Sequence, residues 1–215
     1  VRSVYLDSKN NIWLGLDYTG LDIINRKTKK RSTFNYRKTA EDTTSLRWFT
    51  PNKFLEDNRG NIWIAQGFLG LFQTQDSTFR YFKPNPKDSL KYGHSVTGVL
   101  QLDNKSLLVA AGRYLSVFDL NNKFYKSHHT HSPEDTTAQT LYFRDVIKDR
   151  NGVFWTTGYG LGQIDSDFNV TGAYFKNSDR QLGSLSHNQT ESAREDKNGN
   201  IWVATYGGGL NKMEP

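Results

Sequence analysis

The clearest repeat in this chain of 215 residues reads Glu195-Asp196-Lys197-Asn198-Gly199-Asn200-Ile201-Trp202-Val203-Ala204. Similar copies stand at 6–15, 56–65 and 148–157, and a shorter copy at 102–110 has Leu108 where tryptophan is expected. The aspartates of the five copies, which we call the repeat aspartates, are separated by 50, 46, 46 and 47 residues; they are Asp7, Asp57, Asp103, Asp149 and Asp196. Such regular spacing indicates an internal repeat of about 47 residues.

Each repeat has the pattern of four short strands, which we call a to d. Strand a runs into the aspartate, strand b carries the tryptophan, strand c follows a glycine-rich turn, and strand d is aromatic, as in Phe79-Arg80-Tyr81-Phe82. The Asp-x-x-Gly-Asn turn predicts a tight a–b hairpin, because Gly and Asn tolerate positive φ and the aspartate binds local backbone amides. Four-stranded units of about 40–50 residues are typical blades of a β-propeller.

The sequence therefore predicts an all-β propeller with blades at approximately 1–47, 48–93, 94–139, 140–184 and 185–215. The last blade lacks its strand d, and nothing upstream of Val1 supplies one. We therefore expect an open segment of a larger propeller. A closed ring of five blades, one of them short, is the alternative.

Composition and motifs exclude several classes of protein. No apolar run approaches the ~20 residues of a membrane-spanning helix, so no membrane contact by this segment is expected. The net charge of +6 is spread along the chain, which argues against nucleic-acid binding. There is no cysteine, and no nucleophile elbow, phosphate loop or dinucleotide fingerprint. We expect no catalytic residue and no cofactor.

Two stretches resemble metal sites but depart from the required spacing. The tract His128-His129-Thr130-His131 fits no structural zinc pattern and is better interpreted as a solvated loop. The run from Asp196 begins like a calcium loop, but its sixth position is Ile201 and its twelfth is Gly207. No metal is predicted at either place.

The repeat aspartates and tryptophans are predicted to be structural, because a fixed role in every blade favours architecture over chemistry. The aspartates cap hairpin turns and the tryptophans pack between blades. The residues concerned are Asp7, Trp13, Asp57, Trp63, Asp149, Trp155, Asp196 and Trp202.

Candidate ligand-binding residues lie in the d–a and b–c loops, which share one face of a propeller. Every b–c turn has an aromatic residue, suited to stacking on a sugar; these residues are Tyr18, Phe68, Tyr114, Tyr159 and Tyr206. Trp48 is the tryptophan outside the repeat position. Arg113, His94 and His187 are positioned to meet a carboxylated or sulfated ligand. The alternatives are rings folded onto neighbouring blades, a Trp48 that covers a blade edge, and solvated charged groups.

The motif Glu-Asp-x-x-Gly-Asn-Ile-Trp, followed by Thr205 and Gly207-Gly208-Gly209-Leu210, resembles the two-component regulator propeller repeat. The spacer Ser184-Leu185-Ser186-His187-Asn188 is also similar. Four copies match well and one poorly, so the resemblance spans nearly the whole chain.

The resemblance implies a setting that the residues themselves do not show. It implies a piece of the periplasmic sensor region of a hybrid two-component system, with two seven-bladed propellers and a histidine kinase anchored in the inner membrane. It also implies an oligosaccharide ligand, contacts with the remaining blades of the parent chain, and a homodimeric parent. The alternatives are a propeller scaffold without its own ligand and, less favoured, a glycan hydrolase or lyase.

Overall fold

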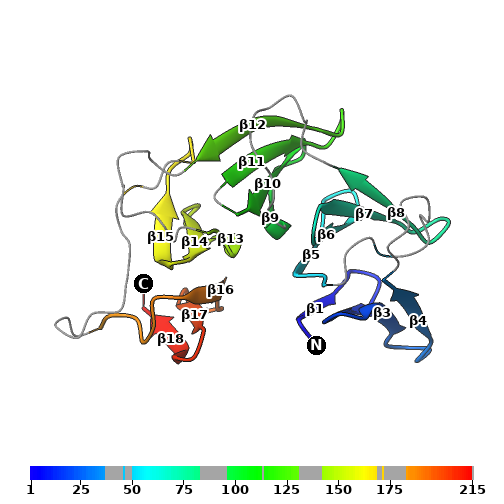
Figure 1. The fold of residues 1–215 in the computed structure, drawn as a ribbon, viewed down its shortest axis with the longest axis horizontal. Helices are drawn as coiled ribbons and strands as arrows, with labels where there is room; N and C mark the ends of the chain where they lie inside the picture. The colour runs from blue at the N-terminus through cyan, green and yellow to red at the C-terminus, as the bar shows by residue number, and fades with distance from the viewer. Residues whose placement is uncertain are drawn as a thin grey trace.

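The computed structural model describes residues 1–36, 46, 50–82, 96–112, 114–130, 142–168, 171 and 183–214. These residues form strands that pair in chain order, each antiparallel to its neighbour, in five separate sheets. The sheets follow one another around an arc (Figure 1). This is the arrangement of a β-propeller, and it confirms the predicted all-β class.

Each sheet corresponds to one repeat. The first blade contains β1 (Ser3–Leu6), β2 (Asn11–Leu16), β3 (Gly20–Asn25) and β4 (Arg31–Asn35). The second contains β5 (Lys53–Glu56), β6 (Ile62–Ala65), β7 (Leu69–Gln73) and β8 (Thr78–Phe82). The third contains β9 (Val96–Asp103), β10 (Ser106–Ala111), β11 (Tyr114–Asp119) and β12 (Phe124–Thr130).

The other two blades have three strands each among the described residues. They are β13 (Asp145–Lys148), β14 (Phe154–Gly158) and β15 (Gly160–Ile164) in the fourth blade, and β16 (Thr190–Glu195), β17 (Ile201–Thr205) and β18 (Gly209–Met213) in the fifth. The aromatic strand d predicted at 173–175 lies outside the described part of the chain.

The repeat aspartate closes the a–b hairpin as predicted. In the second blade, Asp57 Oδ1 accepts hydrogen bonds from the backbone N–H groups of Arg59 and Asn61, both at 2.9 Å. The turn requires a left-handed residue, which is Gly60 here, with φ of 74°. The same position is taken by glycine in the fourth and fifth blades and by Asn10 in the first, with φ of 67°. Glycine and asparagine are the residues that adopt this conformation at least cost.

The aspartate also binds the tryptophan of its own repeat, a contact that the sequence analysis did not foresee. The indole Nε1–H of Trp63 donates to Asp57 Oδ2 at 2.7 Å. The same bond recurs from Trp13, Trp155 and Trp202, at 2.8, 2.9 and 2.9 Å. Burial raises the pKa of Asp57, but the hydrogen bonds from Trp63, Asn61 and Arg59 outweigh it and hold that pKa below its usual value.

Each buried tryptophan packs against the next blade along the chain. Trp13 lies 5.1 Å, between ring centroids, from Phe72 of the second blade, and Trp63 lies 5.4 Å from Phe118 of the third. Leu108 takes this role in the third blade, where it joins the buried cluster that links the third and fourth blades. In each of the first four blades, this position therefore lies in the buried cluster shared with the following blade.

A second link between blades joins their a–b hairpins. The backbone N–H of Ser8, next to Asp7, donates to Glu56 of the second blade at 2.7 Å. The N–H of Arg150 donates to Glu195 of the fifth blade in the same way, at 2.9 Å. Glu56 and Glu195 each directly precede a repeat aspartate, whereas between the second and third blades the N–H of Asn58 donates to Gln101, one residue earlier, at 3.0 Å.

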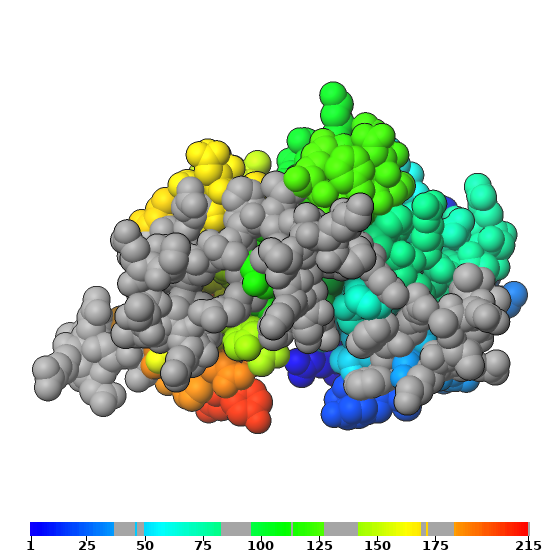
Figure 2. Space-filling model, turned by 45° about the horizontal axis from the view of Figure 1, so that its top comes forward, coloured from blue at the N-terminus to red at the C-terminus, as the bar shows by residue number. Residues whose placement is uncertain are grey.

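The two ends of the arc leave apolar side chains exposed. On the first blade Val4 and Leu6 are 65% and 51% exposed, and on the fifth blade Leu210 is 62% exposed. Trp202 is half-buried, whereas Trp13 and Trp63 are fully buried. These two blades are the ends of the arc, and both lie at the bottom of the view in Figures 1 and 2. The buried clusters of the described residues join consecutive blades, and none of them joins the fifth blade to the first.

Replacing Asp57 by alanine should lower the free energy of unfolding by about 2–3 kcal/mol, because it leaves the buried indole N–H of Trp63 without an acceptor. Asp103→Ala is the matched control, since Asp103 binds the backbone N–H groups of Lys105 and Ser106 and the Ser106 hydroxyl but has no indole partner. That change should cost about 1 kcal/mol. Urea denaturation measures both, and equal losses would contradict the role given to the indole bond.

Candidate functional site

The innermost strands of the five blades surround two adjoining cavities. These strands are β1, β5, β9, β13 and β16, which lie on the inner side of the arc (Figure 1). The cavities have volumes of about 240 and 200 Å³, and residues from all five blades line each of them. We refer to the two together as the axial cavity. A polar cavity at which several blades converge is a suitable place for ligand recognition.

One repeat position supplies a residue to the axial cavity from every blade. Arg2, Asn52, Arg144 and Glu191 each stand five positions before a repeat aspartate, and Thr97 stands six before Asp103 in the third blade. All five residues are polar, but they differ from blade to blade. The structural positions of the repeat stay nearly constant over the same blades. The side chain at the cavity position thus varies between blades, whereas the side chains that build each blade do not.

The two uncharged members of this set hold neighbouring blades together. Asn52 Nδ2 donates to the Val96 carbonyl of the third blade at 3.0 Å. The Thr97 hydroxyl donates to the Phe143 carbonyl, just before β13, at 2.7 Å. Asn52 and Thr97 therefore serve the scaffold, and the chemistry of this end of the cavity rests on its charged members.

The charged members meet at one carboxylate oxygen. Arg2 Nη2 lies 3.8 Å and Arg144 Nη1 lies 3.9 Å from Glu191 Oε2. The three side chains come from the first, fourth and fifth blades and are 47%, 37% and 27% exposed. They form an accessible group with two positive charges and one negative charge in the larger of the two cavities. We call this part the wider end of the axial cavity.

A second charged group, which we call the deeper group, is centred on Lys53 and Asp145, which are 13% and 5% exposed, whereas its third member, Arg194, is 61% exposed. The Lys53 ammonium forms a salt bridge with Asp145 and donates to the Val146 carbonyl at 3.0 Å. Arg194 Nη1 donates to the other oxygen of Asp145 at 3.0 Å. Burial lowers the pKa of Lys53, and the charge of Asp145 opposes this effect. These contacts connect the second, fourth and fifth blades across the axis.

Of the five predicted aromatic residues of the b–c turns, one lines the axial cavity and four do not. Tyr206 is 66% exposed and lines the axial cavity. Tyr18 is 72% exposed but is not among the residues that line the cavity. Phe68, Tyr114 and Tyr159 are half-buried, and none of them lines it.

The remaining predicted residues add little to this site. His187 is exposed, and its Nδ1 accepts the backbone N–H of Gln189 at 3.0 Å. Trp48, Arg113, His94 and His131 lie outside the described residues, as do the side chains at 128 and 129. The carboxylate oxygens of Asp196 accept hydrogen bonds from Asn198, Asn200 and Trp202. A calcium ion would need these oxygens as ligands, but they are already used by N–H donors.

The sequence analysis missed Arg2, Arg144, Glu191 and the Lys53–Asp145 pair. They are ordinary charged residues in unremarkable strands, and they are distant from one another in the chain. A comparison of the repeats at a fixed offset before each repeat aspartate would have found the outer set. Attention to the loops alone did not, because these residues lie where strand a begins.

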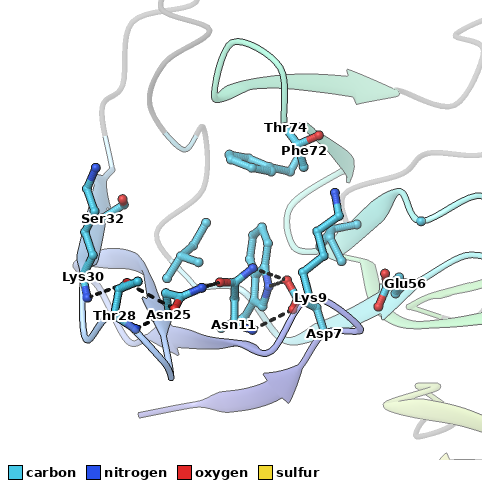
Figure 3. A pocket seen from close by; sticks show the side chains of 14 residues that line it. Asp7, Lys9, Asn11, Asn25, Thr28, Lys30, Ser32, Glu56, Phe72 and Thr74 are labelled. Atoms are coloured by element: carbon cyan, nitrogen blue, oxygen red, sulfur yellow. Dashed lines mark hydrogen bonds between the residues drawn. The ribbon is translucent and has the colours of Figure 1, made fainter.

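A larger cavity, of about 290 Å³, lies at the opposite end of strand a, between the first and second blades (Figure 3). Several of its polar groups are already paired with one another. Asn25 Nδ2 donates to Asn11 Oδ1 at 2.8 Å, and Asn11 Nδ2 donates to Asp7 Oδ2 at 2.9 Å. Asn25 Oδ1 also accepts from Thr28 (Figure 3). This cavity fits a structural role better than recognition.

Asp145→Asn should destabilise the chain by about 3–5 kcal/mol, because it leaves Lys53 buried beside Arg194 without a counter-charge. Adding Lys53→Met to the same variant should restore part of that loss, since the uncompensated ammonium is then removed. Chemical denaturation of the single and double variants measures both effects. A double variant less stable than Asp145→Asn would contradict this account of the deeper group.

The two component regulator propeller family matches residues 184–207, which include the last copy of the repeat. No curated protein matches the chain in sequence. Within the residues that the structure describes, no helix has the length and apolar character needed to cross a bilayer.

Solved structures share the fold at low sequence identity. The extracellular domain of a putative one component system of B. thetaiotaomicron has a TM-score of 0.76 and 15% identity, over 97% of this chain and 26% of its own. That of a putative hybrid two component system of the same organism has a TM-score of 0.71 and 18% identity, over 99% and 26%. Virginiamycin B lyase of Staphylococcus aureus has a TM-score of 0.63 and 12% identity, over 98% and 68%. The chain thus spans about a quarter of the two extracellular domains, and it shares its fold with these domains and with a lyase.

Proposed function

We propose that the chain is a ligand-sensing segment of the extracytoplasmic region of a hybrid two-component sensor histidine kinase. The family match at 184–207 and the similarity to extracellular domains of such systems support this assignment. The segment itself is not an enzyme in this proposal. The parent protein is placed in the periplasm, anchored in the inner membrane, and its homodimeric state stays a prediction from the family resemblance.

The ligand in this proposal is an oligosaccharide that binds at the wider end of the axial cavity. The observation that carries it is the polar set at one repeat position, lined on one side by the exposed ring of Tyr206. Charged side chains that bind sugar substituents and an aromatic ring that stacks on the sugar face are the usual elements of such a site. Ligand contacts to several blades would favour one arrangement of the blades, which the kinase reads as a population shift.

The exposed ends of the arc support an open segment of a larger, seven-bladed propeller. Val4, Leu6 and Leu210 lie on faces that in the other blades are covered by a neighbour. The remaining blades of the parent chain are the expected partners of both faces.

Tyr206→Ala and Tyr18→Ala form a matched pair, since both rings are exposed and both come from b–c turns, but of the two only Tyr206 lines the axial cavity. The measurement is a thermal-shift screen with neutral and acidic oligosaccharides. A glycan that binds should raise the melting temperature of the wild-type chain by about 5–11 °C when its concentration is ~100 times its dissociation constant. Tyr206→Ala should abolish that shift and Tyr18→Ala should retain it.

Two results would contradict the proposal. A wild-type chain that responds to no glycan favours the scaffold alternative, in which these blades only support an interface. Turnover of a glycan by the purified chain favours the hydrolase or lyase alternative instead.

A further inference from the structure

Two arginines in the axial cavity have unused hydrogen-bonding capacity. The guanidinium groups of Arg2 and Arg144 approach the same oxygen of Glu191, at 3.8 and 3.9 Å, distances too long for hydrogen bonds. Neither guanidinium donates a hydrogen bond to any other residue in the described part of the chain. Each guanidinium has five N–H donors in a planar fork that matches a carboxylate or a sulfate. Glu191 therefore neutralises these groups only partly.

The surroundings of the two arginines are also positively charged. Among the described residues, four cationic side chains line the axial cavity, Arg2, Lys53, Arg144 and Arg194, and two anionic ones, Asp145 and Glu191. Lys53 and Arg194 both bind Asp145, so the deeper group is satisfied internally. The surplus positive charge at the wider end lies with Arg2 and Arg144. A concave, partly enclosed site with such a surplus attracts and holds anions.

Glu191 is fixed from the other side by weak contacts. Gln189 Nε2 donates to Glu191 Oε1 at 3.4 Å, and the Thr157 hydroxyl donates to the Glu191 carbonyl at 3.3 Å. The long bond from Gln189 holds the Glu191 carboxylate only loosely, and the bond from Thr157 holds the Glu191 backbone and not its side chain. The side chain can therefore turn away from the arginines while strand β16 stays in place.

We propose that the Arg2–Arg144 pair binds one oxyanion of a sugar, a carboxylate or a sulfate, and that Glu191 is the resident counter-ion which the ligand displaces. This inference rests on the proposed function and specifies the ligand of the same site. The anion receives hydrogen bonds from both guanidinium groups, and the ring of Tyr206 lies on the lining of the same cavity for the sugar that carries it. Arg2 and Arg144 then join the first and fourth blades through the ligand, in place of their contact with the fifth.

The test titrates the full chain with galacturonate, galactose and inorganic sulfate, followed calorimetrically. Galacturonate should bind, and galactose, which lacks the carboxylate, should bind at least about tenfold more weakly. Arg144→Gln should weaken galacturonate binding by about tenfold or more. Glu191→Gln should tighten it by about two- to fivefold, because the competing carboxylate is gone. Binding of sulfate but not galacturonate would support the same site with a sulfated sugar as its source.

Matched controls separate this site from the general charge of the chain. Lys9→Gln removes a positive charge in an exposed a–b hairpin, and Glu214→Gln removes a negative charge near the exposed end of β18. Both should leave the affinity unchanged, and melting curves verify that every variant is folded. The proposal is overturned if neither anion binds, if Arg144→Gln binds like the wild type, or if Glu191→Gln changes affinity no more than Glu214→Gln. A neutral oligosaccharide that still stabilises Arg144→Gln would overturn this inference and leave the sensor function standing.

Discussion

The repeat aspartate is the residue on which the rest of the structure depends. One carboxylate oxygen closes the a–b hairpin and the other fixes the indole of the tryptophan, as Asp57 does with Asn61 and Trp63. The indole is thereby held against the next blade, where Trp63 meets Phe118. A single side chain thus connects turn, strand and neighbouring blade. The hydrogen bonds to both oxygens require the carboxylate in its ionised, acceptor-only form. The third blade keeps the turn through Asp103 but replaces the indole by a leucine that packs without a polar anchor.

This anchoring leaves the beginning of strand a free to vary. The turn and the indole anchor of each repeat lie at the hairpin end, whereas Arg2, Arg144 and Glu191 project at the other end of the same strands. At the same position in the second and third blades, Asn52 and Thr97 still bind a neighbouring blade. The five blades can therefore carry side chains of four kinds to one axis, which gives a repeat protein an asymmetric site from similar units.

Much of the fold was predictable because the repeat period is a local signal. The strands and the hairpin turns follow from residues close together in the chain. The Asp–Trp hydrogen bond was not predicted, because it depends on the indole folding back over its own hairpin. The charged pairs were missed for a different reason: Lys53 and Asp145 lie 92 residues apart and meet only where blades converge. Of the predicted aromatic set, the axial geometry selects Tyr206.

The central claim is that ligand recognition occurs at the end of the axial cavity where strand a begins. Amide chemical shifts of the ¹⁵N-labelled chain, measured during titration with galacturonate, test this claim most directly. The account predicts shifts that concentrate at Arg2, Arg144, Glu191 and Tyr206, with those of Lys9 and Lys30 unchanged. Shifts that concentrate instead around Lys9 and Lys30, at the cavity between the first and second blades, would contradict it.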